Sequence, residues 1–423
     1  TQRKALVTNA ISSFKPSESN MRPVLTPSEL LQGRVAGVTV STGSGNLGSS
    51  ERMSIRGAAS LSASNEPLYV VDGIPILNSN ASLFNMGEDL SSMAVLNLTD
   101  IESIEVLKDA ASAAIYGSRG ANGVIIVTTN RAASDTEQKS IQYNGYVAIG
   151  QVAKHMDLLS ADQWRAYVRE NNVGQAIDYG ADTDWQKELE RTAISHSHNV
   201  AISNSRKDNG YRASITYQNN QGVIVRNSMN RLAGSLAAYQ TGWNGRLRIE
   251  AGINANFDSW HPIDNRIFER MTNLNPTFPV YDQNGDFAQI GGTNTENPVE
   301  INANRADDQK RHRFLGYGKV ELDLVKGLKA VANGSYEYQS TEGGLYKPTY
   351  AMMEGKSEKG WGQRTYAKYT NKQIETYLNY DLELARIHRM NFMAGYSYLI
   401  NVYDGFGSSR SGFDTDAFLY NNL

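Results

Sequence analysis

Apolar and polar residues alternate one by one through residues 246–258. Leu247, Ile249 and Phe257 fall on one side of this segment, and Arg248 and Glu250 fall on the other. Because successive side chains of a β-strand point to opposite faces, this period of two predicts a strand with one apolar and one polar face. A strand of a soluble β-sandwich alternates in the same way, so this segment alone does not decide the fold class.

The alternation recurs, and it predicts nine strands at about 140–151, 195–204, 211–220, 228–240, 246–258, 312–324, 327–340, 372–384 and 388–400. Charged residues are rare on the apolar side, where a Lys or Arg near the centre of a bilayer would cost about 2–4 kcal/mol. The repetition therefore predicts a transmembrane antiparallel β-barrel, with one face toward lipid and the other toward a wet interior.

The connections between these strands alternate in length. Those at 205–210, 241–245, 325–327 and 385–387 are short, whereas 152–194, 259–311 and 341–371 are long and only 221–227 is a short connection on the long side. Bacterial barrels have short periplasmic turns and long outer loops. The long connections are therefore predicted to lie outside the cell, and residues 401–423 to begin another outer loop.

Nine strands are too few to close such a barrel. An open sheet in lipid would leave unpaired backbone groups at its edges, and plugged outer-membrane barrels close with about 22 strands. We therefore expect residues 136–423 to be the first part of a larger barrel in a longer polypeptide.

Residues 1–135 have a different pattern, which predicts a small α+β domain. Thr26-Pro27-Ser28-Glu29 has the sequence of a helix start, with a capping hydroxyl and a proline at the first helical position. Short strands are predicted at 35–40, 52–56, 68–71, 101–107 and 124–129, with a helix over 110–116. The glycine-rich segment 117–123 resembles a phosphate-binding loop, but such a loop precedes a helix, whereas these glycines follow one. We interpret Gly117 as a helix end and Gly120 and Gly123 as a turn.

Composition excludes several classes of protein. The 423 residues include 37 Gly, 23 Tyr and no Cys, so a disulfide scaffold and a thiolate metal site are excluded. The net charge of −3 gives no basic surface for nucleic acid. No apolar run approaches the roughly 18 residues that a membrane helix needs. Asp72 in VVDGIP has no catalytic companions and is interpreted as a turn residue, so no enzyme site is predicted.

No metal or cofactor is predicted either. His196 and His198 share one face of a strand, but a third ligand is missing. Asp282, Asn284 and Asp286 resemble the start of a calcium loop, yet Phe287 occupies the position that requires glycine. A turn around Asn284-Gly285 explains this segment better.

Several motifs carry a family resemblance. LLQGRVAGVTV, SIRG, EPLYVVDGIPI, DIESIEVLKDAASAAIYGSRGANGVIIVTT and NPTFPVYDQNGDF stand in the order in which the SusC/RagA-like TonB-dependent outer-membrane transporters have them. The chain thus resembles the plug domain of that family followed by the early part of its barrel. An N-terminal extension with a TonB box is expected ahead of the plug.

The resemblance implies an importer in the outer membrane of a Gram-negative, Bacteroidetes-like cell. Its implied partners are a SusD-like surface lipoprotein that covers the outer opening, TonB on the periplasmic side, outer-membrane lipid, and an oligosaccharide or peptide ligand. The resemblance favours a glycan. A siderophore or metal-chelate receptor, which shares plug and barrel, and a non-transporting adhesion protein remain as alternatives.

Candidate contact residues follow from this architecture. The polar loops 41–50 and 58–66 are predicted to form the ligand-facing apex of the plug, with Asn46, Ser62 and Asn65 as contacts. Trp185, Trp260 and Trp361 are predicted in long outer loops, where they could stack on sugars or a partner, or pack within the loops. Polar contacts between plug and barrel wall are predicted for Arg56, Arg119, Arg248 and Glu250.

Two further predictions concern the membrane boundary and the rim. Tyr336, Tyr338, Tyr396 and Tyr398 are predicted near the outer ends of their strands and Trp243 in a periplasmic turn, as parts of interfacial aromatic girdles. Residues 160–171 are predicted to form an amphipathic helix that packs on the barrel rim.

Overall fold

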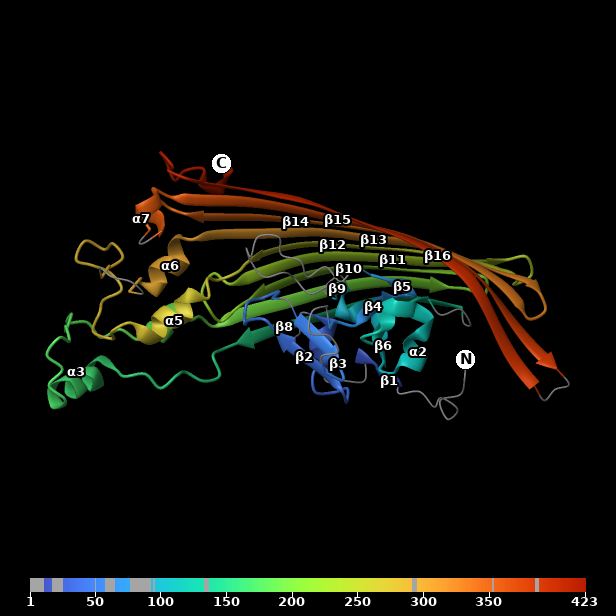
Figure 1. Ribbon diagram of the computed structural model, residues 1–423, viewed down its shortest axis with the longest axis horizontal. Helices are drawn as coiled ribbons and strands as arrows, with labels where there is room; N and C mark the ends of the chain where they lie inside the picture. The colour runs from blue at the N-terminus through green and yellow to red at the C-terminus, as the bar shows by residue number, and fades with distance from the viewer. Residues whose placement is uncertain are drawn as a thin grey trace.

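The chain folds into a curved nine-stranded sheet with a small N-terminal unit in its concavity (Figure 1). The computed structural model describes residues 11–16, 26–49, 51–57, 65–76, 93, 96–132, 137–290, 295–351, 354–384 and 388–423. Four helices gather at one end of the sheet in Figure 1: α3 (Ala161–Glu170), α5 (Arg266–Asn273), α6 (Pro298–Asn304) and α7 (Glu354–Glu358). Among the described residues, no helix has the length and apolar character needed to cross a membrane.

The nine strands of the wall are β8 (Gln138–Gly150), β9 (Ala193–Ser205), β10 (Asn209–Gln221), β11 (Ser228–Gly242), β12 (Leu247–His261), β13 (Ala306–Val325), β14 (Leu328–Lys347), β15 (Trp361–Leu384) and β16 (His388–Ser411). Each pairs antiparallel with the next in the chain, so the order runs from β16 to β8 without a crossover. The predicted strands and their up-and-down order are confirmed, as a partial barrel.

The last four strands are longer than predicted. β15 begins at Trp361 rather than near 372, and β16 ends at Ser411 rather than near 400, so residues 401–411 are strand and not loop. On β14 the outward residues are apolar from Leu328 to Tyr338, and beyond that level outward residues such as Lys368 on β15 are polar. Where both faces are polar the period of two vanishes from the sequence, although the backbone hydrogen bonds continue.

This extension also corrects the placement of the tyrosines. Tyr336, Tyr338, Tyr396 and Tyr398 lie in the middle of β14 and β16, well before the strands end. Tyr336 and Tyr338 end the apolar run on the outward face of β14, whereas on β16 the exposed Ile400 and Val402 continue the apolar face beyond Tyr396 and Tyr398. Tyr396 is 67% exposed on the outward face, which is the environment expected of an interfacial aromatic residue.

The N-terminal unit, called the plug from here on, contains a sheet of order β1-β6-β7-β4-β5 and a separate β2-β3 hairpin. Its elements are β1 (Ile11–Phe14), α1 (Pro27–Leu31), β2 (Val38–Thr42), β3 (Glu51–Ile55), β4 (Leu68–Val71), β5 (Ile74–Pro75), β6 (Ile101–Leu107), α2 (Ala110–Ala113) and β7 (Val124–Thr129). The core includes the fully buried Ile104, Val106 and Ile125, and Leu315 of β13 packs into it from the wall.

Local signals explain most of the plug elements. The Thr26 hydroxyl accepts from the Glu29 backbone N–H at 3.4 Å and Pro27 opens α1, as the capping pattern predicts. The helix predicted over 110–116 is wrong in part, because α2 ends at Ala113 and continues as a 3-10 helix. Gly117 interrupts that turn with φ 60° and ψ −146°. The predicted boundary at residue 135 falls among residues 133–136, outside the described chain.

The amphipathic helix is formed but does not pack on the rim. Ser160 and Gln163 cap α3 reciprocally. Tyr167 on its apolar side is 54% exposed, and Figure 1 shows α3 extending away from the sheet. Arg165 ties the helix to its own loop, through Asp178 at 2.8 Å and the Ala181 carbonyl at 2.8 Å. Its apolar spacing predicted the helix but not what would cover it.

Candidate functional site between plug and wall

Asp100 joins the base of the plug to the inner face of the wall. It precedes β6 in the chain and is 8% exposed. Arg212 of β10 approaches its carboxylate at 3.0 Å, and the Ser214 hydroxyl donates to it at 2.6 Å. Burial raises the pKa of Asp100 above its ordinary value, against the lowering effect of Ser214 and Arg212. The carboxylate is thus a polar anchor between two parts of the chain that are far apart in sequence.

A second anchor runs through Asp72, Arg131 and Glu250. Asp72 has φ 52° and accepts hydrogen bonds from the Thr129 backbone at 3.0 Å and hydroxyl at 2.7 Å. Arg131 lies 3.2 Å from Asp72 and 2.8 Å from Glu250 of β12, so it bridges plug and wall. Asp72 therefore holds a turn and a strand end together, in keeping with its interpretation as a turn residue.

The four predicted plug–wall residues have different positions. Arg119 lies 3.7 Å from Glu375 of β15, and Glu250 contacts Arg131 directly. Among the described residues, Arg248 is linked to the plug through Glu250, at 2.6 Å, while its guanidinium lies over the Tyr239 ring. The backbone N–H of Arg56 donates to the Gly37 carbonyl at 2.8 Å, and this contact lies within the plug.

Sequence reasoning missed Asp100, Arg131 and Arg212. No local signal marks them, because their partners across the plug–wall boundary are more than a hundred residues away, 112 for Arg212 and Asp100 and 119 for Arg131 and Glu250. The φ of 52° at Asp72 agrees with its interpretation as a turn residue, but nothing in the sequence predicted its bonds to Thr129.

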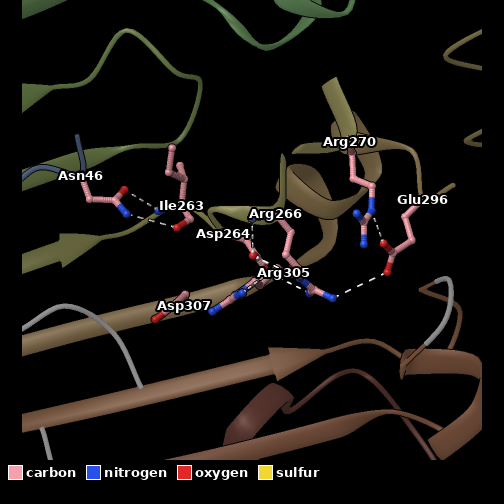
Figure 2. Close-up of polar contacts among 8 residues, drawn as sticks. All are labelled: Asn46, Ile263, Asp264, Arg266, Arg270, Glu296, Arg305 and Asp307. Atoms are coloured by element: carbon pink, nitrogen blue, oxygen red, sulfur yellow. Dashed lines mark hydrogen bonds and ion pairs between the residues drawn. The ribbon is translucent and has the colours of Figure 1, made fainter. Parts of the chain in front are cut away.

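At the outer end, Asn46 at the tip of the β2-β3 hairpin bonds to the loop that follows β12. The Ile263 backbone N–H donates to its Oδ1 at 3.0 Å, and its Nδ2 donates to the Ile263 carbonyl at 3.3 Å (Figure 2). Asn46 is 7% exposed. We call this pair of hydrogen bonds the latch. The predicted apex residue thus contacts the protein itself.

The latch connects the plug to a compact cluster built from the outer loops. Its core contains Trp185 of α4 (Trp185–Leu189), Ile224, Ile263, Ile267 and Phe278, which come from three different connections. We call this cluster the outer platform. Because the platform has its own buried core, the long loops form a structured unit above the wall rather than separate loops.

Ion pairs stiffen the platform beside the latch (Figure 2). Asp264 pairs with Arg266 at 2.8 Å and with Arg305, while Arg266 and Arg270 reach Glu296 at 3.6 and 2.6 Å. Burial raises the pKa of Asp264, but the hydrogen bond from Arg266 and the charge of Arg305 outweigh it and hold that pKa well below its usual range. Asp264 is therefore ionised throughout the physiological range.

The three tryptophans are not exposed loop residues. Trp185 is 3% exposed, stacks on Phe278 and donates to the Asn275 carbonyl at 3.3 Å, so it packs within the loops. Trp260 and Trp361 lie in β12 and β15, which corrects their placement in loops. Trp260 is 3% exposed and packs with Leu47 of the plug, whereas Lys347 lies over the Trp361 ring.

The remaining candidate residues form no metal site in the described part of the chain. Ser62 lies outside the described residues, and Asn65 is half-buried just before β4. His198 bonds to the Tyr143 hydroxyl at 2.7 Å on the outward face of the wall. Asp282 accepts from the backbone of Asn284 and Asp286 in a turn. Within the described part of the chain, no group of three or more His, Cys, Asp and Glu is arranged to hold a metal ion.

A cavity of about 480 Å³ separates the plug tip from the outer ends of β8, β9 and β10. The residues that line it come from α1, the β2-β3 hairpin and these three strands, and they include Glu29, Glu51, Ser195 and Asn220. Its volume falls within the roughly 300–1,000 Å³ typical of ligand pockets. The site therefore combines a plug held by polar contacts with a chamber beside the plug tip.

Comparisons with known proteins agree with this architecture. The family model "TonB-dependent Receptor Plug Domain" matches residues 3–124. The chain is 34% identical over 410 residues to the TonB-dependent receptor SusC of Bacteroides thetaiotaomicron, which covers 89% of this chain and 40% of that protein. It is 27% identical to the TonB-dependent receptor P3 of Formosa agariphila, over 100% of this chain and 41% of the relative.

Solved structures share the fold. A chain of the RagAB peptide importer in the "closed-closed" state superposes with a TM-score of 0.81 at 22% identity, covering 97% of this chain and 49% of that one. The ferric citrate transporter FecA superposes with a TM-score of 0.61 at 13% identity, over 95% and 49%. The chain thus spans about two fifths to one half of the length of these proteins.

A plug seated against the inner face of an up-and-down sheet defines a plugged β-barrel receptor, of which this chain contains the plug and nine strands. The sequence match to SusC and the superposition on RagAB each extend over both the plug and the wall of this chain. The chain belongs to the SusC/RagA-like TonB-dependent receptors.

Proposed function

We propose that the full-length protein imports an oligosaccharide across the outer membrane, with the plug as its gate and no chemical step. The observation that supports this most is the character of the plug's attachment. Asp100, Arg131, Arg119 and Asn46 hold the plug through hydrogen bonds and ion pairs spread over both ends of the wall. Such contacts can be exchanged for water, so the plug can be displaced at lower cost than one held by a continuous apolar core.

The proposal includes the partners of this family of receptors. TonB pulls on the N-terminal side of the plug from the periplasm, and a SusD-like lipoprotein covers the outer opening above the outer platform. A glycan is favoured by the SusC/RagA-type motifs of the plug and by the likeness to SusC. We also propose that the boundary between plug and barrel lies near residue 135.

Peptide import is the second candidate, because the chain superposes on a structure described as a peptide importer. A metal chelate is less favoured, since the likeness to the ferric citrate transporter is weaker. A non-transporting adhesion protein would use the same surface loops without needing a plug that can move.

Reconstitution of the full-length protein into liposomes tests the proposal. Intact protein is expected to leave the vesicles closed to oligosaccharides, and deletion of residues 1–135 is expected to open a pore that passes them. An adhesion protein would show no flux that depends on the plug, and this result would rule out transport. Mass analysis of co-purified material then reports whether a lipoprotein and a glycan or a peptide accompany the protein.

A further inference from the structure

Among the residues that the structure describes, the lining of the chamber beside the plug tip contains two carboxylates and no basic group. Glu29 and Glu51 line it, whereas no Lys, Arg or aromatic residue is found among its described lining residues. Hydroxyl and amide side chains, such as those of Ser44, Ser195 and Asn220, make up half of the rest. An anionic ligand would be repelled here, because like charges at short range in a partly desolvated site cost several kcal/mol.

Two buried polar groups in this lining are incompletely bonded. Glu51 is 4% exposed, and its Oε1 accepts from the Thr26 hydroxyl at 2.5 Å. Its Oε2 has no hydrogen-bond donor among the residues that the structure describes. Asn220 of β10 is 5% exposed, and within the same described residues its Nδ2 has no acceptor. Buried polar atoms without partners are rare, and they point to a group that is bound there at another stage.

Glu51 Oε2 needs a hydrogen-bond donor and Asn220 Nδ2 needs an acceptor, so a ligand that satisfies both must donate and accept hydrogen bonds. An ammonium group can donate to Glu51 but leaves the Asn220 amide without an acceptor. A carboxylate can accept from Asn220 but leaves Glu51 without a donor. A hydroxyl does both, and a sugar presents several of them at neighbouring positions. Among the described lining residues none is aromatic, and the larger apolar ones are Leu47, Ile149 and Val223. Polar groups at a few points fix the orientation of a ligand.

We propose that this chamber is a subsite for an uncharged, hydroxyl-rich glycan segment, held between Glu51 of the plug and Asn220 of the wall. The proposal rests on the importer function argued above and specifies its substrate as a neutral rather than an acidic glycan. Because its two polar residues belong to different domains, a bound glycan contacts the gate and the wall together.

Binding by the full-length protein in detergent tests the subsite, measured by titration calorimetry. The probes are neutral hexasaccharides of glucose, mannose and xylose, an oligogalacturonate of the same length, and an uncharged hexapeptide. At least one neutral hexasaccharide is expected to bind, more tightly than the oligogalacturonate. Glu51→Gln and Asn220→Ala are each expected to weaken that binding about tenfold or more, since each removes one hydrogen-bond partner.

Matched controls separate the subsite from general damage. Glu188→Gln changes an exposed glutamate of α4 and is expected to leave binding unchanged. Asn220→Ala lies in the wall, so it tests the subsite even if Glu51→Gln prevents the plug from folding. Binding by no neutral hexasaccharide, tighter binding of the oligogalacturonate or the hexapeptide, or unchanged affinity in both variants would overturn the subsite.

The importer function is tested separately by the liposome experiment. Plug-dependent flux with unchanged binding in the two variants refutes the subsite and leaves the importer standing. Loss of any plug-dependent flux in the unmodified protein refutes the importer itself, whatever the calorimetry gives.

Discussion

Single residues decide how the plug is seated. Asp100 and Arg212 are 8% and 6% exposed, and their ion pair joins the plug to β10. Removing one partner of a buried pair leaves the other charge uncompensated and typically costs about 3–5 kcal/mol. Asp100→Asn is therefore expected to lower the free energy of plug unfolding by about that amount, measured by urea-dependent proteolysis of the full-length protein. Asp162→Asn, whose side chain is 91% exposed, is the control, and equal effects of the two would contradict the anchor.

Asp264 gives the platform a dependence on pH. Its folded pKa lies below the ordinary value, so its contribution to stability is present above the unfolded pKa and is lost as the pH falls through the folded pKa. The protection of the α5 amides, measured as exchange relative to the intrinsic rate at each pH, is expected to be constant from pH 7 to about pH 4, the ordinary aspartate value, and to fall below it. Asp264→Asn is expected to show the faster exchange already at pH 7. Equal exchange in both proteins at pH 7 would remove Asp264 from this role.

At the scale of elements, the latch couples the β2-β3 hairpin to the loop before α5. Asn46→Ala leaves the buried backbone groups of Ile263 without partners, which costs about 1–3 kcal/mol. Exchange of amides in residues 262–273 is expected to accelerate while the wall strands remain protected. Asn171→Ala, at the exposed end of α3, is the matched control. Unchanged exchange in the Asn46 variant would show that platform and plug are independent.

The strands β13–β16 are long enough to extend beyond the outward apolar band, so the membrane boundary is expected to cross them. Leu378 lies within the outward apolar band of β15, whereas Ser408 of β16 lies beyond that band. Leu378→Arg is expected to cost about 2–4 kcal/mol of folding free energy in lipid, and Ser408→Arg about 0–1 kcal/mol. Refolding into vesicles at several urea concentrations measures both. A similar cost at the two positions would place the strand extension inside the hydrocarbon layer.

For the whole molecule, the plug and the wall are stabilised differently. Continuous backbone ladders join the strands of the wall, whereas the plug is seated mainly by separated polar contacts. With a urea dependence of about 1–3 kcal/mol/M for a small domain, a few molar urea should release the plug before the barrel unfolds. Liposomes with the full-length protein are expected to leak reversibly at such concentrations. Leakage only on loss of the strand signal in circular dichroism would show that plug and barrel unfold together.

The pattern of the sequence predicted the wall strand by strand, because a strand between two different media must alternate. The apolar band on Leu247 to Phe257 and its polar opposite are fixed by that requirement alone. Capping at Thr26 and the turn at Gly117 are likewise local, since they depend on the backbone preferences of a few neighbouring residues. The same pattern failed for residues 401–411, where water on both faces removes the reason to alternate.

Only the tertiary structure decided what these elements hold between them. The partners of Asp100 and Arg131 on the wall, and of Asn46 in the outer platform, lie more than a hundred residues away, so no local pattern could reveal them. Trp185 is buried by the packing of three outer connections and Trp260 packs with Leu47 at the plug tip, and neither contact can be read from neighbouring residues in the sequence. The sequence therefore determined a plug and the strands of a barrel, because lipid and water impose alternation, while the anchors, the latch and the chamber exist only because the fold brings distant polar groups together.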